Sequence, residues 1–215
     1  MTDTESTSGT EFTTEADWFV EASRGFRALL PGLTEDVLHR PALGQWDVRA
    51  LLGHTCRAFL TVENYLTQER GSPVTLATPT DYFRAASAGG LADSAEVAQR
   101  GRAAGQALGD RPAAAAEELA DRVTRLVTSS PPDAVVTTPF GSMTLASYLP
   151  TRAFELTVHG IDLARATGQD VPESLQRCAG PAIALALTLS SGAELVEILL
   201  ALTGRQPLPD TFSLL

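Results

Sequence analysis

Apolar residues recur at α-helical spacing through several long stretches of this chain, and proline or glycine closes most of them. One stretch begins at Asp17 and stops at Pro31 and Gly32. Another begins after Asp47, which can cap it, and runs to Leu66. Alanine and leucine are abundant and β-branched residues rarely cluster, which favours helix over strand. These patterns predict an all-α fold.

The middle of the chain continues the helical pattern, with one extended segment. Residues 81–128 form an alanine-rich helical stretch that is interrupted at residues 89–90 and broken or kinked near Pro112. Two serines and two prolines at 129–132 end it. Residues 135–143 alone read as extended chain.

The last third is predicted to be helical again. Thr144 can cap a helix over 145–167, and Gly168 is well placed as its C-terminal cap. Residues 172–202 are helical in character. Helices of these lengths favour an antiparallel four-helix bundle with a C-terminal helical extension.

The pattern divides the chain into three parts. We expect a disordered polar tail over residues 1–13, the bundle over 14–170, and a helical extension packed on the bundle over 171–215. The oligomeric state is expected to be a monomer or a homodimer.

Charge and composition exclude several classes of function. The formal net charge is −10 with no compensating basic patch, which argues against nucleic-acid binding. The N-terminus lacks the regions of a signal peptide, and polar residues interrupt the most apolar stretch, 182–202. We therefore expect no membrane span and a cytoplasmic protein with reduced thiols. The two cysteines make no disulfide framework, and Cys56 is expected to be a small core residue, while nothing near Cys178 suggests activation.

A polar stripe runs along the predicted helix 145–167. Glu155 and His159 are four residues apart and so project from one face on adjacent turns. Apolar residues flank this stripe on both sides, which predicts that it faces the interior. Buried polar groups need partners, and a metal ion is one partner that suits a carboxylate and an imidazole. An exposed Glu–His pair without metal is the alternative interpretation.

A third ligand comes from the few histidines of the chain. Of the three, His39 is expected to be exposed in a loop, whereas His54 lies within a predicted helix beside its apolar stripe. Its position alone also fits a half-buried histidine satisfied by a side chain or water. Together with Glu155 and His159 it would complete a site for Zn²⁺, or for Fe²⁺, Ni²⁺ or Mn²⁺, with coordination positions left open.

The same residues carry a family resemblance. Residues 44–59 resemble the Trp-x-Val-x-x-Leu-x-x-His signature of mycothiol-dependent maleylpyruvate isomerase-like proteins, which belong to the DinB-like superfamily of metal-binding four-helix bundles. Residues 138–168 resemble its second signature, Arg-x-x-Glu-x-x-x-His-Gly-x-Asp-Leu-Ala. The resemblance implies that His54, Glu155 and His159 bind a divalent metal, usually zinc.

The resemblance also implies a chemistry. Related proteins use mycothiol or bacillithiol as a cosubstrate in isomerisation or thiol transfer, so the implied partners are a low-molecular-weight thiol and a small-molecule substrate. A substrate carboxylate would call for an arginine: Arg152 on the ligand stripe and Arg205 in a short C-terminal motif are the candidates. Arg152 could instead pair with Glu155 or Asp162. Asp162 could orient a ligand histidine or pair locally.

One departure from the family affects the substrate. The founding isomerase carries a separate C-terminal α/β domain, whereas the residues after Gly168 read mainly as helix here. Taken together, the resemblance implies a divalent-metal-dependent, thiol-using enzyme, an S-transferase or a maleylpyruvate-isomerase-type enzyme. The alternatives are a metal-binding module without turnover, such as a sensor or an interaction protein, and a helical protein without metal.

Overall fold

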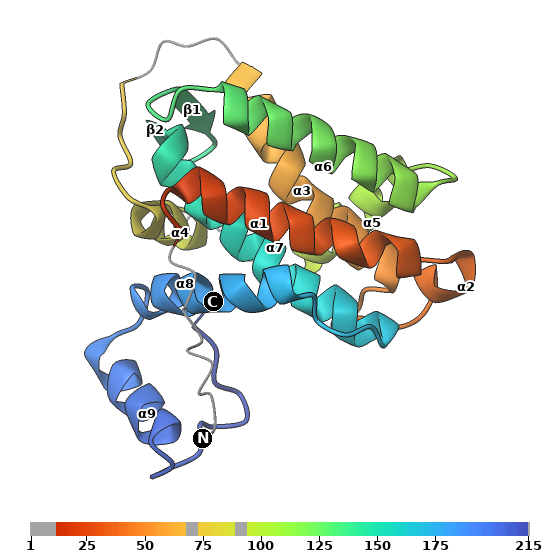
Figure 1. Ribbon diagram of the computed structural model, residues 1–215. Helices are drawn as coiled ribbons and strands as arrows, with labels where there is room; N and C mark the ends of the chain where they lie inside the picture. Colours follow the sequence, from red (N-terminus) through yellow and green to blue (C-terminus); the bar gives the residue numbers. More distant parts are fainter. Residues whose placement is uncertain (1–11, 68–72, 89–93, 215) are drawn as a thin grey trace, which may run out of the picture.

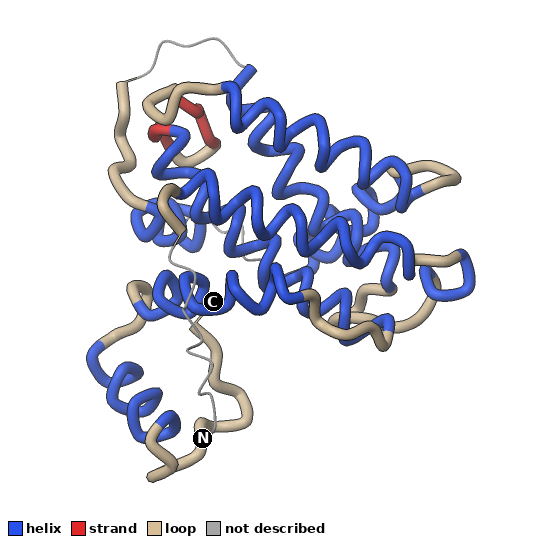
Figure 2. The backbone as a smooth tube through the Cα atoms, viewed as in Figure 1, coloured by secondary structure: helices blue, strands red, loops and turns tan. Residues whose placement is uncertain are grey.

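The structure, a computed structural model, describes residues 12–67, 73–88 and 94–214, and these are mostly helical (Figures 1 and 2). In chain order the elements are α1 (Glu15–Leu29), η1 (Leu30–Gly32), α2 (Glu35–Leu38), α3 (Val48–Thr67), α4 (Pro79–Ala88), α5 (Ser94–Ala107), α6 (Pro112–Ser129), β1 (Val135–Thr138), β2 (Gly141–Thr144), α7 (Leu145–Thr167), α8 (Glu173–Leu187) and α9 (Gly192–Leu202). The predicted helical class is confirmed, with one small hairpin added.

Four long helices, α1, α3, α6 and α7, form the bundle. In Figure 1, α1 and α7 run in one direction and α3 and α6 in the opposite direction. The α3 helix packs against α5, α6 and α7, and α1 packs against α6, α7 and α8. The predicted four-helix bundle is confirmed, and α3 and α7 lie side by side in it.

Capping residues fix where the bundle helices begin and end. The Asp47 side chain accepts a hydrogen bond of 2.8 Å from the Ala50 amide, as expected of the residue before α3. Thr144 caps α7 by accepting from the Ser147 amide at 3.1 Å. Gly168 ends α7 with a φ of 72°, a conformation that glycine adopts without penalty. The boundaries of both site-bearing helices are thus encoded locally.

Aromatic side chains fill the centre of the bundle. Phe19 and Phe26 of α1 pack against Phe59 of α3, with ring centroids 5.7 and 5.4 Å apart, and all three are fully buried. Burying one such side chain contributes about 1.5–3 kcal/mol. This packing fixes α3, and with it the side chains on its opposite face.

Two predicted helical stretches are divided in the structure. The stretch over 81–128 is three helices, α4, α5 and α6. The predicted break near Pro112 is confirmed, because α6 begins there, and the predicted interruption at residues 89–90 lies outside the described residues. The stretch over 172–202 is two helices, because Ser191 caps a new helix through a hydrogen bond from the Glu194 amide.

The extended segment is a two-stranded antiparallel hairpin. Val136 pairs with Met143, and both side chains are fully buried. The amides of Thr75 and Leu76 donate to the Ser142 carbonyl at 2.8 and 3.0 Å. The hairpin thus attaches the segment before α4 to the start of α7.

The ends of the chain differ in how they pack. Most of the predicted disordered tail, residues 1–11, lies outside the described residues. In the C-terminal part, α8 packs on α1 and α7, whereas α9 buries none of its residues and projects from the bundle in Figure 1. Across the described ranges, no helix has the length and apolar character needed to cross a membrane.

Candidate metal centre

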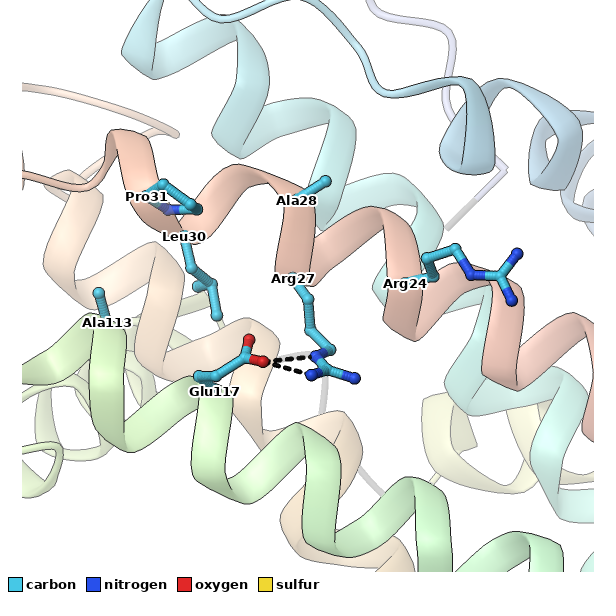
Figure 3. A pocket seen from close by; sticks show the side chains of 7 residues that line it. All are labelled: Arg24, Arg27, Ala28, Leu30, Pro31, Ala113 and Glu117. Carbon is cyan, nitrogen blue, oxygen red and sulfur yellow. Dashed lines mark hydrogen bonds and ion pairs between the residues drawn. The ribbon is translucent and has the colours of Figure 1, made fainter.

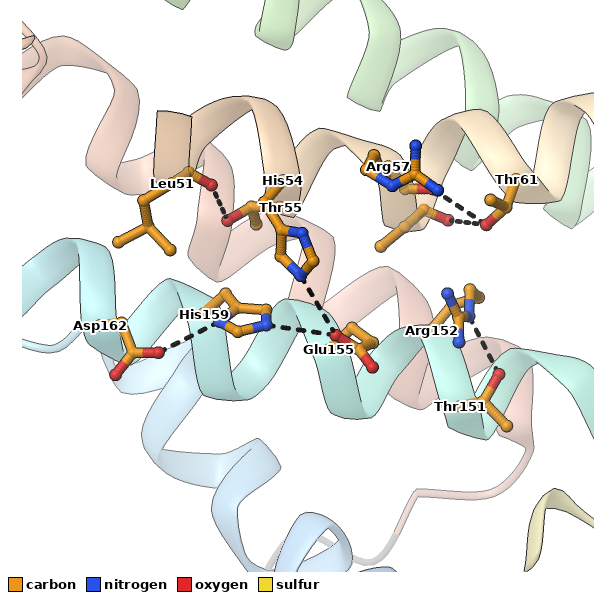
Figure 4. Close-up of polar contacts among 11 residues, drawn as sticks. Leu51, His54, Thr55, Arg57, Thr61, Thr151, Arg152, Glu155, His159 and Asp162 are labelled. Carbon is orange, nitrogen blue, oxygen red and sulfur yellow. Dashed lines mark hydrogen bonds and ion pairs between the residues drawn. The ribbon is translucent and has the colours of Figure 1, made fainter. Parts of the chain in front are cut away.

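Three side chains from two helices converge between α3 and α7 (Figure 4). His54 comes from α3, and Glu155 and His159 come from successive turns of α7. The Glu155 Oε2 atom lies 3.2 Å from His159 Nε2 and 4.0 Å from His54 Nε2. One ligand atom from each residue lies within 4.8 Å of the other two.

These separations fit a shared metal ion. Metal–ligand bonds of about 2.0–2.2 Å place neighbouring ligand atoms of a tetrahedral site roughly 3.4 Å apart. Small side-chain rotations would bring all three groups to that spacing. Two imidazoles and one carboxylate occupy three coordination positions and leave at least one open. The donor set suits zinc and other first-row divalent metals, and it does not identify the metal.

Asp162 contacts the His159 ring on the side away from Glu155 (Figure 4). Its Oδ2 atom lies 3.1 Å from His159 Nδ1, which donates to the carboxylate. This bond leaves Nε2, which faces Glu155, without a proton when the ring is neutral. A carboxylate that orients a ligand imidazole in this way is common at metal sites.

His54 is held by ring contacts. Its ring lies 4.5 Å from the Trp46 ring and 4.7 Å from the His159 ring, the latter edge-on. Its Nδ1 atom is buried and has no hydrogen-bond partner among the described residues. The other ring nitrogen, Nε2, lies 4.0 Å from Glu155 Oε2, the side chain that shares the candidate centre with it.

The charges of the centre shift the pKa of every ligand. Burial, together with the neighbouring His159, lowers the pKa of His54 to about 4. Burial alone would raise the pKa of Glu155, but the His159 hydrogen bond and the Arg152 charge hold it at about 2. Burial would lower the pKa of His159, but the hydrogen bonds to Asp162 and Glu155 raise it to about 9. The centre therefore favours a neutral His54 and an ionised Glu155, and it attracts a positive charge.

The centre lies at the edge of the core. The side chains of His54, Glu155 and His159 are 18%, 27% and 15% exposed. The expectation of apolar packing on both sides of the stripe is only half right, because Val158 on one flank is exposed. Each of the three candidate ligands is therefore partly accessible to solvent.

Arg152 lies further along the same face of α7. It is buried, and its guanidinium lies 5.3 and 5.1 Å from the ring centres of Tyr82 and Tyr148. Its Nε atom donates to the Thr151 hydroxyl at 3.0 Å. No direct ion pair joins it to a carboxylate of the described residues, although its charge contributes to lowering the pKa of Glu155. The Tyr82 and Tyr148 rings are its principal neighbours instead.

The remaining predicted residues lie apart from the centre. Arg205 is exposed after α9, and its described contact is with the Thr203 carbonyl at 3.4 Å. His39 is exposed, as expected, and lies 3.6 Å from Glu35. Cys56 and Cys178 are both free and buried.

Sequence reasoning assigned no role to three residues near the centre. Trp46 stacks on His54 and donates to the Ala98 carbonyl at 3.0 Å. Arg57 is three residues after His54, so helical spacing could have placed it on the same face. Tyr82 comes from α4, and only the tertiary packing brings it to Arg152.

A separate groove lies between α1 and α6 (Figure 3), with a volume of about 510 Å³. Arg27 on its wall is paired with Glu117 of α6. The charges there are already matched, and the groove holds none of the candidate ligands.

A comparison with protein families identifies the family to which this chain belongs. A family model described as the mycothiol maleylpyruvate isomerase N-terminal domain matches residues 19–164, more than half of the chain. Neither the curated proteins nor the solved structures give a significant match. The matched segment contains α3, most of α7 and all three candidate ligands. The chain therefore belongs to the mycothiol maleylpyruvate isomerase N-terminal domain family.

Proposed function

We propose that this protein is a divalent-metal-dependent enzyme that uses a low-molecular-weight thiol of the mycothiol kind, for S-transfer or for a maleylpyruvate-isomerase-type reaction. The observation that carries the proposal is the convergence of His54, Glu155 and His159, with Asp162 behind His159. Zinc is the metal we propose, as one of the divalent metals that this donor set suits.

A divalent metal in this centre would lower the pKa of a coordinated thiol and so supply a thiolate at neutral pH. The chain supplies the holding groups. His54 and His159 offer imidazole nitrogens, Glu155 offers a carboxylate, and Asp162 keeps the His159 ring in one orientation. The partial exposure of these groups leaves room for the thiol to approach.

The thiol has to come from outside the chain. Burial raises the pKa of both Cys56 and Cys178 to about 12, so neither is a thiolate at neutral pH. In S-transfer, the external sulfur forms a bond to carbon and a leaving group departs with its electron pair. In isomerisation, the sulfur adds to a conjugated double bond, the resulting single bond rotates, and the sulfur departs with its electron pair.

The test measures metal content and thiol-dependent turnover in the same preparations. Wild-type protein is expected to hold one zinc per chain and to consume a chromogenic electrophile or maleylpyruvate only when mycothiol is present. His54→Ala is expected to lose both properties. His39→Ala, which removes an exposed histidine, is the matched control and is expected to keep both.

Two results would contradict the proposal. Full thiol-dependent turnover in His54→Ala would show that the centre is not used. Stoichiometric zinc without turnover on either substrate class would instead favour a metal-binding module.

A further inference from the structure

Trp46 lies against His54 at the start of α3. The indole ring is tilted by 35° to the imidazole, with ring centroids 4.5 Å apart, which is an offset stack. Trp46 is buried, and it precedes Asp47, the residue that caps α3. The stack therefore joins the segment before α3 to a candidate ligand within that helix.

The imidazole of His54 has few other restraints. The torsion that turns a histidine ring is broad, so contacts have to select its orientation. Ligand imidazoles are usually oriented by a hydrogen bond from the nitrogen that does not bind the metal, as Asp162 orients His159 at 3.1 Å. The corresponding atom of His54, Nδ1, is buried and has no hydrogen-bond partner among the described residues. Packing against the rings of Trp46 and His159 therefore has to fix the direction of His54 Nε2.

Trp46 is itself fixed from several directions. Its Nε1 atom donates to the Ala98 carbonyl of α5 at 3.0 Å. Its amide donates to the Leu43 carbonyl at 2.9 Å, and its carbonyl accepts from the Ala42 amide at 2.9 Å. A Cβ atom on Gly101 would lie 2.7 Å from the indole ring, so α5 also packs on the ring at close range. The indole is thus a fixed surface, and α5 determines where it lies.

A purely structural role is the alternative. Trp46 could serve only to pack the segment before α3 against α5, with His54 as an incidental neighbour. Two observations favour a role at the centre. The stack covers the candidate imidazole that lacks an orienting hydrogen bond, and it leaves His54 Nε2 on the side of Glu155, 4.0 Å from Oε2.

We propose that Trp46 is a positioning residue for the metal centre: its ring face holds the His54 imidazole so that Nε2 is directed toward Glu155 and the metal. The α5 helix acts through Trp46, because Ala98 and Gly101 fix the indole. This inference rests on the proposed function, since the orientation of the ring matters to the centre only if the centre binds a metal.

The first test compares two substitutions of Trp46 in the full chain. Trp46→Phe keeps an aromatic face but loses the indole N–H, whereas Trp46→Leu loses both. Both variants lose the hydrogen bond to Ala98, so both are expected to lower the thermal midpoint of the metal-free protein. Zinc affinity, measured by competition with a chromogenic chelator, is expected to fall about tenfold or more in Trp46→Leu and less than about threefold in Trp46→Phe.

Trp18→Leu is the matched control. It removes a second buried indole, from α1, a helix that carries none of the three candidate ligands. This variant is expected to lower the thermal midpoint while its zinc affinity stays within about twofold of wild type. The control separates a loss of stability from a loss of ring orientation.

A second readout follows Trp46 directly. The chain has two tryptophans, so Trp18→Phe leaves Trp46 as the only one, and Trp46→Phe leaves Trp18. Cobalt(II) is the probe, because a bound ion with visible d–d absorption quenches the fluorescence of a nearby indole. Cobalt binding is expected to quench most of the emission of Trp18→Phe and a smaller share of the emission of Trp46→Phe.

Three results would overturn the positioning role while leaving the metal centre intact. One is equal zinc affinity in wild type and Trp46→Leu. Another is an equal loss of affinity in Trp46→Phe and Trp46→Leu, because lost packing against α5 would then explain both. The third is bound cobalt that leaves the emission of Trp18→Phe unchanged.

Other outcomes bear on the proposed function. Weaker zinc binding in Trp46→Leu than in Trp46→Phe, in a protein without thiol-dependent turnover, would support the positioning role and contradict the proposed enzyme. Wild-type protein that takes up neither zinc nor cobalt would contradict both proposals.

Discussion

At the scale of single residues, Asp162 determines which nitrogen of His159 is available. Its carboxylate accepts from Nδ1 at 3.1 Å, so Nε2 is presented toward Glu155 and His54. Partners of this kind contribute to metal affinity by orienting the ligand ring and raising its basicity.

We predict that Asp162→Asn lowers zinc affinity about 10–100-fold while leaving helix content unchanged. Competition with a chromogenic chelator measures the affinity, and circular dichroism measures the helix content. Asp36→Asn is the control, since Asp36 is exposed and pairs with Arg40 at 2.9 Å. An unaltered zinc affinity in Asp162→Asn would show that the His159 orientation does not depend on this carboxylate.

The raised pKa of His159 makes metal binding depend on pH. In the metal-free protein the pKa of His159 is about 9, so the ring carries a proton at pH 7 that a metal must displace from Nε2. We predict that zinc binding at pH 7 releases about one proton and that affinity rises about tenfold per pH unit until pH reaches about 9. Calorimetry in buffers of different ionisation enthalpy measures the proton count, and a count of zero would contradict the account.

The three candidate ligands could be selected from the sequence, but their surroundings could not. The four-residue spacing of Glu155 and His159 fixes their common face in any helix, and the family signatures point to His54. Helical spacing could have placed Arg57 on the His54 face of α3, but only the packing of α3 against α7 brings it to the same side of Glu155 as Arg152. The contact of Tyr82 with Arg152 depends on α4, which is distant in the sequence.

At the scale of elements, the position of His54 depends on the close approach of α3 to α5. A Cβ atom on Gly53 would lie 2.0 Å from the Gly105 amide nitrogen, and one on Gly105 would lie 2.5 Å from the Arg49 carbonyl oxygen. Two glycines facing each other therefore set the distance between these helices.

We predict that Gly53→Ala destabilises the protein by about 1–3 kcal/mol, since the backbone of α5 has to move. The neighbouring His54 should move with α3, so zinc affinity is expected to fall as well. Gly180→Ala is the matched control: nothing lies within 4 Å of its added carbon, and removing a helical glycine should stabilise α8 by about 0.5–1 kcal/mol. Denaturant unfolding measures both changes, and equal stability of the two variants would contradict the close-approach argument.

The sequence predicts which stretches are helical more reliably than where one stretch breaks into two helices. Asp47, Thr144 and Gly168 have side chains or backbone freedom that mark helix ends, and these ends are where the structure has them. The division at Ser191 was not predicted, because the apolar residues around it continue with similar spacing. The two-glycine contact between α3 and α5 depends on tertiary placement, because Gly53 and Gly105 come from separate helices.

At the scale of the whole molecule, α9 differs from the bundle. The helix is 11 residues long and buries none of them, and Val196, Leu199 and Leu202 are 57%, 61% and 76% exposed. A short helix without packing is marginally stable in water. The charge and composition of the chain do not indicate that α9 is exposed while the bundle helices are buried.

We predict that amides of α9 exchange with solvent near the rate of a fraying helix, whereas those of α3 and α7 require global unfolding. Hydrogen–deuterium exchange with mass spectrometry measures both. If the amides of α9 are protected from exchange as strongly as those of α7, α9 is not exposed in solution. That result would favour the homodimer over the monomer, because a second copy could cover the apolar residues of α9.

The most direct test of the central claim is anomalous scattering from crystals of zinc-loaded protein at the zinc absorption edge. The account predicts one strong peak per chain, about 2.0–2.2 Å from His54, from Glu155 and from His159 Nε2. A peak elsewhere, or one that excludes His54 from the coordination sphere, would contradict it.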